Sequence, residues 1–207
     1  MRDTFHADNV WQLGIRDRII IPFYRRHFEE GRFVVIDKGG LATLIQRQYA
    51  IDTIGQGPNG GCYAIEEKIV RWPKNNVPHD RFFLETYSCT RPGRVRVGWM
   101  HYCRADRLHY CFVNEGDNSL TSYMFPFAEL KRWVFANVSR FETHTLRDTV
   151  NCSAGLKVPI GELTRHVIHA KRVLMAPPEK LVLRTQMSFK EQLTTAPNWD
   201  VKPWRSA

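Results

Sequence analysis

Apolar and β-branched residues gather in two short runs on either side of a glycine-rich segment in the first third of the chain. The first run covers 49–54 and the second covers 62–70, while the segment 55–61 between them holds glycines, a proline and an asparagine. Apolar runs bounded by turn residues are typical of β-strands. The pattern therefore predicts a β-hairpin over 48–70, around which the rest of the chain is organised.

Charged residues interrupt both arms of this hairpin where core residues would be expected. Asp52, Glu66 and Lys68 lie within otherwise apolar segments, and buried ionised groups are costly unless they are paired or bind a metal. With the turn centred on its proline, Asp52 lies opposite Ala64 and projects on the same face as Glu66 and Lys68, while Glu67 points the other way. A one-residue slip would exchange the faces of the second arm. The acid-x-lysine spacing of Glu66 and Lys68 favours the first register.

The hydrophobic pattern predicts further helices and strands along the chain. Helical spacing favours a basic helix over 8–28, with Asp8 as its N-cap and a kink at Pro22. The segment 41–48 fits either a turn of helix or an extended lead-in to the hairpin. The remaining elements are strands at 32–37, 81–87, 108–113 and 119–125, a strand-prone stretch at 143–158, and helices that begin at Pro126 and Pro159, the second continuing to Val173.

The composition of the chain limits which classes of protein it fits. At 207 residues with 43% apolar content, the chain can bury the core of one domain, which we place at 1–175, followed by a polar and basic extension at 176–207. The net charge of +9 favours a polyanionic partner, nucleic acid first. Five irregularly spaced cysteines indicate reduced thiols. With neither a signal-type start nor an apolar run near the roughly 20 residues that span a bilayer, a cytoplasmic protein without a membrane partner is expected.

Two histidine–cysteine pairs offer a competing site. His101 with Cys103, and His109 with Cys111, each stand two residues apart and together count four zinc-compatible ligands. Structural zinc sites usually take cysteine pairs from tight knuckles with two to four residues between them. Buried cysteines with ordinary histidines are therefore the favoured interpretation, and a zinc-stabilised interaction module stays an alternative. The sequence contains no Walker-type, Gly-x-Ser-x-Gly or His-Glu-x-x-His motif.

The hairpin motif resembles the core of the PD-(D/E)xK nuclease superfamily. The resemblance rests on Ile51-Asp52, the hairpin, and Ile65-Glu66-Glu67-Lys68, with Ile51 standing where the family name has proline. It continues over 83–88, Gly98-Trp99, 105–110 and 125–133, as in small phage and prophage members, and covers roughly 48–137. The resemblance implies an α/β (α+β) fold of restriction-endonuclease type, in which helices flank a mixed central sheet of four or more strands. It also implies a bacterial cell or a phage-infected host.

The same resemblance implies a Mg²⁺-dependent nuclease that acts on DNA rather than RNA, with Mn²⁺ able to substitute. Asp52, Glu66 and the backbone carbonyl of Ile65 or Glu67 would hold the metal through hard oxygen ligands. Lys68 would orient the attacking water and offset charge in the transition state. Candidates for supporting roles around this set are Asp17, Gln48 and Glu85.

Basic residues flank the hairpin and would bind the phosphate backbone without reading sequence. They are Arg71, Lys74, Arg91, Arg94 and Arg96. An alternative from another class keeps the same fold without the chemistry, as a nucleic-acid-binding or inhibitory protein with no cleavage activity. Cleavage assays with Mg²⁺ and with chelator separate the two.

Overall fold

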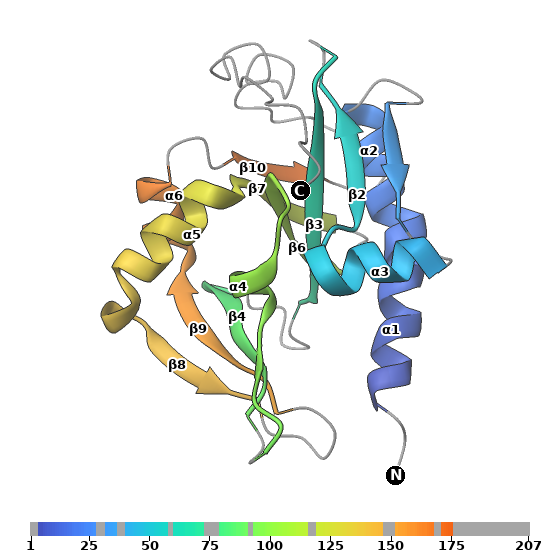
Figure 1. Ribbon diagram of the computed structural model, residues 1–207. Coiled ribbons are helices and arrows are strands. Elements are labelled where there is room, and N and C mark those ends of the chain that lie inside the picture. The colour runs from blue at the N-terminus through green and yellow to red at the C-terminus, as the bar shows by residue number, and fades with distance from the viewer. Residues whose placement is uncertain are drawn as a thin grey trace.

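The computed structural model describes the chain in nine stretches (Figure 1). The described residues are 4–27, 32–36, 40–57, 60–72, 79–90, 93–115, 119–146, 152–167 and 171–175. Two β-sheets and the helices packed against them make up this part of the chain. The extension expected at 176–207 lies outside the described residues. No helix in the described ranges is long and apolar enough to cross a membrane.

The larger sheet has six strands in the order β1-β2-β3-β6-β7-β10. β3 and β6 run parallel, whereas the other neighbouring pairs are antiparallel. The strands are β1 (Phe33–Val35), β2 (Thr53–Gln56), β3 (Cys62–Arg71), β6 (Arg107–Asn114), β7 (Ser119–Pro126) and β10 (Lys171–Met175). Buried clusters on both sheet faces contain helical residues. The expectation of an α/β fold with a mixed sheet of four or more strands flanked by helices is therefore confirmed.

A second, four-stranded antiparallel sheet packs against one face of the first, and the sequence did not foresee it. Its order is β5-β4-β9-β8, formed by β4 (Arg81–Cys89), β5 (Arg96–Val97), β8 (Glu142–Thr145) and β9 (Ala154–Pro159). Phe82 of β4 joins the two sheets, because its ring lies 4.9–5.8 Å from four aromatic rings of β6 and β7. Those rings belong to Tyr110, Phe112, Tyr123 and Phe125. The strand at 81–87 is therefore not a neighbour of the hairpin within one sheet.

The N-terminal helix covers the other face of the larger sheet. It runs as α1 (Thr4–Ile15), a π-helical turn η1 (Arg16–Ile20) and α2 (Ile21–His27). Because α1 begins at Thr4, Asp8 lies inside the helix and the prediction of Asp8 as N-cap is wrong. The irregularity expected at Pro22 takes the form of the π turn just before it, where the Ile21 N–H bonds to the Arg16 carbonyl five residues back. Ile15, Ile20 and Phe23 are buried against β3, β6 and β7 in one cluster.

The segment before the hairpin is a helix, which resolves the ambiguity at 41–48. This helix, α3, covers Gly40–Tyr49. Ala50 follows with a φ of 48°, a left-handed conformation that reverses the chain into β2. The strand predicted from Tyr49 therefore begins only at Thr53. The cost of the strained Ala50 backbone is met by its burial and by the α3 hydrogen bond from the Ala50 N–H to Gln46.

Short helices cover the face on which the second sheet lies. They are α4 (Trp99–Tyr102), α5 (Phe127–Ala136), the 3-10 turn η2 (Val138–Arg140) and α6 (Ile160–His166). Pro126 caps α5 at its start, as the sequence predicts. The helix predicted to run to Val173 ends at His166 instead, and β10 pairs with β7 as an edge strand. Helical and strand periodicity are hard to separate over so short an apolar run.

Replacing Phe82 with alanine tests the contact between the sheets. Phe82 is fully buried among four aromatic rings, so Phe82→Ala should lower the free energy of unfolding by about 3–5 kcal/mol. Urea denaturation followed by tryptophan fluorescence measures this change. Leu41→Ala, at a position 70% exposed on α3, should stay within about 0.5 kcal/mol of wild type. Equal effects of the two substitutions would contradict the packing described here.

Candidate active site

The hairpin brings Asp52 and Glu66 together from β2 and β3. The observed register pairs Thr53 with Ile65, so the register predicted from sequence is off by two residues. An even shift keeps every side chain on its face. The Asp52 N–H donates to the Ile65 carbonyl at 2.9 Å, which joins Asp52 to β3 just before β2 begins. The Ile65 carbonyl, one of the two candidates for a metal ligand, is thus already used in strand pairing.

Asp52 is held by hydrogen bonds to its carboxylate. Oδ2 accepts the Glu67 backbone N–H at 2.9 Å, and Oδ1 accepts Nε2 of Gln46 at 3.3 Å. Gln46 also donates to the Ile36 carbonyl at 2.6 Å, so α3, β1 and the hairpin meet at this point. The glutamine that contacts Asp52 is therefore Gln46, whereas Gln48 is exposed on α3. Gln46 could not be identified from the sequence, because periodicity did not decide whether 41–48 forms a helix, and this helix sets the position of the Gln46 side chain.

Glu66 forms an ion pair with Lys68 on the same face as Asp52. Its side chain is 4% exposed. Burial raises the pKa of Glu66 well above its usual value; the Lys68 charge counteracts this shift, and the Asp52 charge and a hydrogen bond with Asp52 add to it. Two carboxyl groups in hydrogen-bonding contact can share a proton or hold a cation between them.

Lys68 lies between acidic and aromatic groups. Burial acts to lower the pKa of Lys68, but the nearby Glu66 and Asp52 carboxylates outweigh burial and raise the pKa. The ammonium stands 4.8 Å from the centre of the Trp99 ring, a cation–π contact from α4. Lys68 is therefore charged and held in place on two sides.

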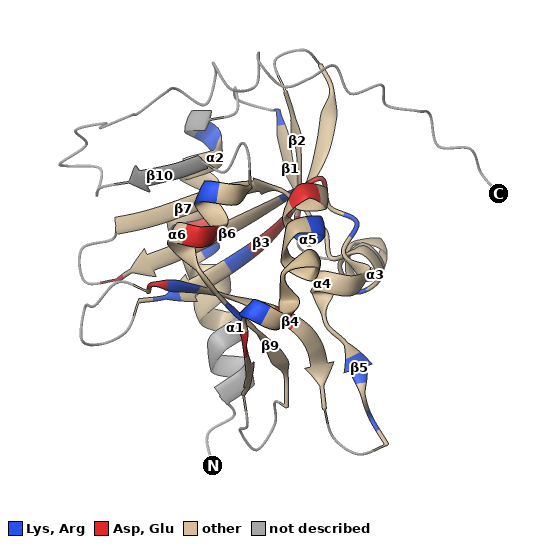
Figure 2. Ribbon diagram, turned by 90° about the vertical axis from the view of Figure 1, so that its left-hand side faces the viewer, with Lys and Arg blue, Asp and Glu red and all other residues tan. Residues whose placement is uncertain are grey.

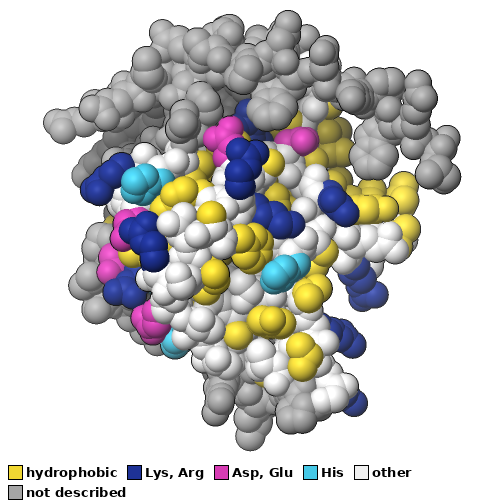
Figure 3. All heavy atoms as spheres, turned by 60° about the vertical axis from the view of Figure 1, so that its left-hand side comes forward, with side chains coloured by type: hydrophobic (Ala, Val, Ile, Leu, Met, Phe, Trp, Pro, Cys, Tyr) yellow, Lys and Arg dark blue, Asp and Glu magenta, His cyan; other side chains and the backbone are white. Residues whose placement is uncertain are grey.

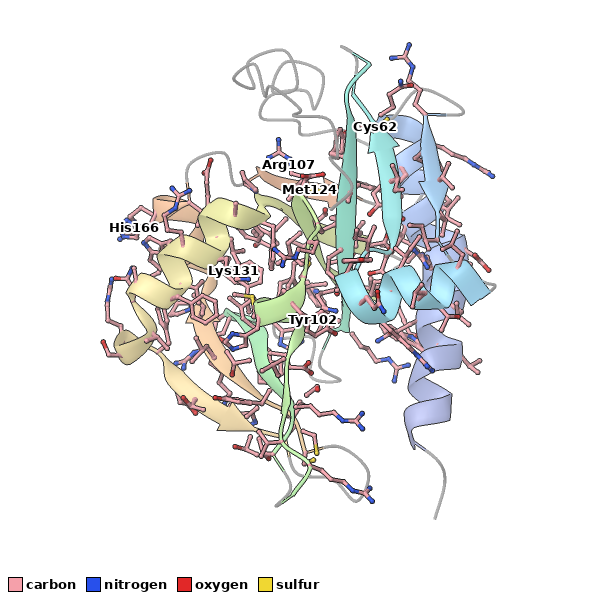
Figure 4. All side chains as sticks on the ribbon, in the orientation of Figure 1. Cys62, Tyr102, Arg107, Met124, Lys131 and His166 are labelled. Atoms are coloured by element: carbon pink, nitrogen blue, oxygen red, sulfur yellow. The ribbon has the colours of Figure 1, made fainter. Side chains whose placement is uncertain are left out.

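Glu85 and Tyr102 lie close to Lys68. Burial raises the pKa of Glu85, and the Lys68 charge and the Trp99 backbone N–H lower it. The structure thus brings Glu85 near Lys68, although from the second sheet. Burial also raises the pKa of Tyr102, with Lys68 acting against the shift and Glu66 adding to it. Figure 4 shows Tyr102 between α4 and the hairpin. The sequence did not single out Tyr102, because its role depends on where α4 packs.

A buried network on the reverse face of β3 supports the hairpin. Glu67 accepts a 2.7 Å hydrogen bond from Oγ1 of Thr53 and lies 3.1 Å from Nε of Arg16. Arg16 also donates to the Asp52 carbonyl at 2.7 Å. Glu67 therefore points away from Asp52 and Lys68, as expected from the alternation of strand side chains. Asp17, the N-terminal acid considered for the site, is exposed, and it is Arg16 that reaches the hairpin.

The four zinc-compatible residues do not converge. His109 is buried between Tyr24 and Ser122, at 2.7 Å and 2.5 Å, with the Cys111 thiol 3.2 Å away on the α1–α2 face. Cys103 belongs to the core on the opposite face, where burial raises the pKa of its thiol to about 12. The convergence that a zinc-stabilised module requires is therefore absent for these four residues. Across the described residues, no group of three or more histidine, cysteine or acidic side chains could hold a metal ion.

The predicted phosphate-binding residues are not gathered at one place. Arg71 pairs with Glu115 at 2.7 Å and lies 4.4 Å from the Trp11 ring, so its charge is engaged within the protein. Arg94 and Arg96 are exposed at β5. In Figure 2, β5 lies towards the lower right of the molecule, whereas the charged middle of β3 lies near its centre. Lys74 and Arg91 lie outside the described residues.

Comparison of the chain with family models, with curated proteins and with solved structures finds no match. The assignment of a function therefore rests on the geometry above.

Substitution of Asp52 tests the contact between the carboxyl groups. Because the pKa of Glu66 is raised, folding favours its protonated form, and stability falls as pH rises from the unfolded pKa towards the folded one. Asp52→Asn removes one cause of that shift. We expect Asp52→Asn to lose less stability than wild type as pH rises, and to have a higher Tm than wild type at pH 7.

Thermal unfolding between about pH 4 and pH 8 measures this dependence, since the usual glutamate pKa lies near 4.3. Asp80→Asn is the matched control, because the Asp80 side chain is 86% exposed. An Asp52→Asn variant that loses as much stability with rising pH as wild type would contradict the contact.

The ion pair behind the hairpin yields a second prediction. Glu67→Gln leaves the Arg16 charge buried without its partner, which should cost about 3–5 kcal/mol. The double variant Arg16→Met/Glu67→Leu removes both charges and should recover most of that loss. Urea denaturation of the single variants Arg16→Met and Glu67→Leu and of the double variant gives the coupling energy. Additive losses would show that the two side chains do not interact.

Proposed function

We propose that this protein is a Mg²⁺-dependent nuclease that hydrolyses phosphodiester bonds in DNA. The observation that carries the proposal is the contact between the Asp52 and Glu66 carboxyl groups, with the Lys68 ammonium bound to Glu66 on the same sheet face. A buried acid with a raised pKa, here Glu66, is costly for stability and typical of sites that do chemistry.

The residues present fit a magnesium ion. Mg²⁺ is commonly bound through one or two carboxylates together with waters and substrate phosphates, so a cage of three or more acidic side chains is not required. Asp52 and Glu66 would hold it, with the Glu67 carbonyl as a further oxygen donor. A bound Mg²⁺ supplies Lewis-acid polarisation of the phosphate and lowers the pKa of a coordinated water.

The protein's own groups have distinct tasks in this proposal. The Glu67 N–H and the Gln46 amide keep the Asp52 carboxylate in one orientation, so no rearrangement is needed when substrate arrives. Lys68, held by Glu66 and Trp99, places a positive charge where negative charge grows on the phosphate oxygens. Glu85 lies near enough to Lys68 to keep it protonated.

The charge of the whole chain supports a nucleic-acid substrate. A net charge of +9 raises the local concentration of a polyanion, and Arg94 and Arg96 are exposed at and just before β5. Contacts of this kind bind phosphates without reading sequence.

Cleavage assays test the proposal directly. Wild type, Asp52→Asn and Lys68→Met are incubated with supercoiled, linear and single-stranded DNA and with RNA, in Mg²⁺, Mn²⁺ or EDTA. We expect wild type to cleave DNA only when metal is present. The cleavage rate of either variant should be at least about 100-fold lower, because each substitution removes a charged group that stabilises the transition state.

Two control variants keep the test specific. Asp80→Asn and Lys157→Met change one exposed acid and one lysine paired with Glu142 on the second sheet, and both should cleave like wild type. Unchanged cleavage by Asp52→Asn and Lys68→Met would overturn the proposal. Binding of DNA without cleavage by wild type would favour the inactive, nucleic-acid-binding alternative.

A further inference from the structure

A row of aromatic side chains leads away from the candidate site along the outer side of β4 and α4. We call Tyr87, His101 and Phe135 the aromatic strip. The ring of His101 lies 6.2 Å from that of Tyr87 and 5.1 Å from that of Phe135. Tyr87 is 41% exposed, His101 is exposed and Phe135 is half-buried. The strip thus offers π-faces at the surface rather than in the core.

The strip is joined to the site through the same short elements. Tyr87 stands two residues beyond Glu85 on β4, across a register shift in the pairing of β4 with β9. His101 stands on α4 between Trp99, which covers Lys68, and Tyr102. A chain bound with one phosphate at Lys68 would therefore have neighbouring nucleotides over the strip.

Close backbone packing holds the strip in position. The Gly98 N–H donates to the Thr86 carbonyl at 2.7 Å. A Cβ on Gly98 would stand 2.5 Å from the Glu85 carbonyl oxygen, so only glycine lets α4 approach β4 this closely. On the other side, Nζ of Lys131 from α5 donates to the His101 carbonyl at 2.6 Å. Figure 4 shows Lys131 between α5 and α4.

The surroundings of the strip are basic and apolar. The segment 93–105 carries Arg94, Arg96 and Arg104, all exposed, and no acidic residue. Val95 and Val97 are also exposed there. Figure 3 shows hydrophobic, basic and histidine side chains mixed over the middle and right of this side of the molecule, while acidic side chains lie towards its top and left.

We propose that the aromatic strip binds unpaired bases, so that the substrate of this protein is single-stranded DNA. Base stacking on aromatic rings combined with basic side chains for the backbone is the general mode of single-strand binding. Bases inside a duplex are stacked on one another and do not offer their faces to a protein. The inference rests on the proposed function in one respect, that the strip lies beside a cleavage site. Binding of DNA by the strip can be measured without cleavage.

Fluorescence anisotropy in EDTA, with full-length protein, a labelled 20-nucleotide oligothymidylate and a labelled 20-base-pair duplex, tests the inference. We expect wild type to bind the single strand at least tenfold more tightly. Tyr87→Ala should weaken that binding about tenfold, the usual loss when one stacked base loses its ring, while Tyr87→Phe should keep it. Val34→Ala, at a position 63% exposed on the edge strand β1, should bind like wild type.

Equal affinity for the two DNAs, or binding unchanged by Tyr87→Ala, would overturn the strip as a binding surface. These outcomes are separate from the cleavage test. Single-strand binding through Tyr87 without cleavage in Mg²⁺ would keep this inference and refute the nuclease. Asp52-dependent cleavage with no effect of Tyr87→Ala on binding would do the reverse.

A different observation carries a second inference, on the second sheet. The Sγ atoms of Cys89 and Cys152 lie 2.8 Å apart, closer than two unbonded sulfur atoms usually pack. A β-bridge joins the two residues, and the Thr90 N–H and hydroxyl both donate to the Cys152 carbonyl, at 2.9 Å and 2.8 Å. The backbone around the pair is thus already held together.

We infer that Cys89 and Cys152 form a reversible disulfide when a disulfide oxidant such as oxidised glutathione is present. The two thiols give up two protons and two electrons, an S–S bond forms between them, and the oxidant is reduced to two thiols. The bond would close a loop between positions 63 residues apart, which stabilises the folded state by restricting the unfolded chain. The sequence-based expectation of five reduced thiols would then hold only under reducing conditions.

Peptide mapping and thermal unfolding in oxidised glutathione and in dithiothreitol test this pairing. We expect a Cys89–Cys152 peptide and a Tm higher by roughly 5–10 °C in the oxidised sample. Cys89→Ser and Cys152→Ser should lose both effects, and Cys62→Ser, at an exposed cysteine, should keep them. Free thiols at Cys89 and Cys152 after oxidation would overturn the inference.

Discussion

The buried ion pair between Arg16 and Glu67 is the interaction on which the arrangement of the candidate site depends. Removing either partner would leave an uncompensated charge in the core, so the N-terminal helix cannot leave the sheet without a large cost. Arg16 also holds the Asp52 carbonyl. Because Glu67 is fixed behind β3, its neighbours Glu66 and Lys68 must face the opposite side, where Asp52 meets them.

The second sheet and α4 contribute two residues of the candidate site, Glu85 and Trp99, that the hairpin does not contain. Packing of Phe82 among the rings of the larger sheet sets β4 over that face, and this position brings Glu85 near Lys68. α4 follows β5 and places Trp99 over the Lys68 ammonium. The site is therefore built by two sheets and a four-residue helix, while the Asp52 and Glu66 carboxyl groups belong to the hairpin alone.

The hairpin carries charge on both faces, and the two sets have different consequences. On the helix side, Glu67 pairs with Arg16 and accepts a hydrogen bond from Thr53, while burial raises its pKa. Burial also raises the pKa of Glu66 on the opposite face, where the Lys68 charge counteracts the shift and the Asp52 charge adds to it. A cation bound beside Asp52 and Glu66 would relieve the repulsion between their charges.

The sequence by itself determined where the main strands lie along the chain, the hairpin, the helix after Pro126 and the division of the hairpin charges between two faces. That division survived an error of two residues in register, because strand side chains alternate with a period of two. Only tertiary structure decided the rest: the second sheet, Gln46 rather than Gln48 as the partner of Asp52, and Arg16 rather than Asp17 as the helix residue that reaches the hairpin. Local patterns report which face a residue takes within its own element, whereas contacts between elements depend on packing, which no short stretch of sequence contains.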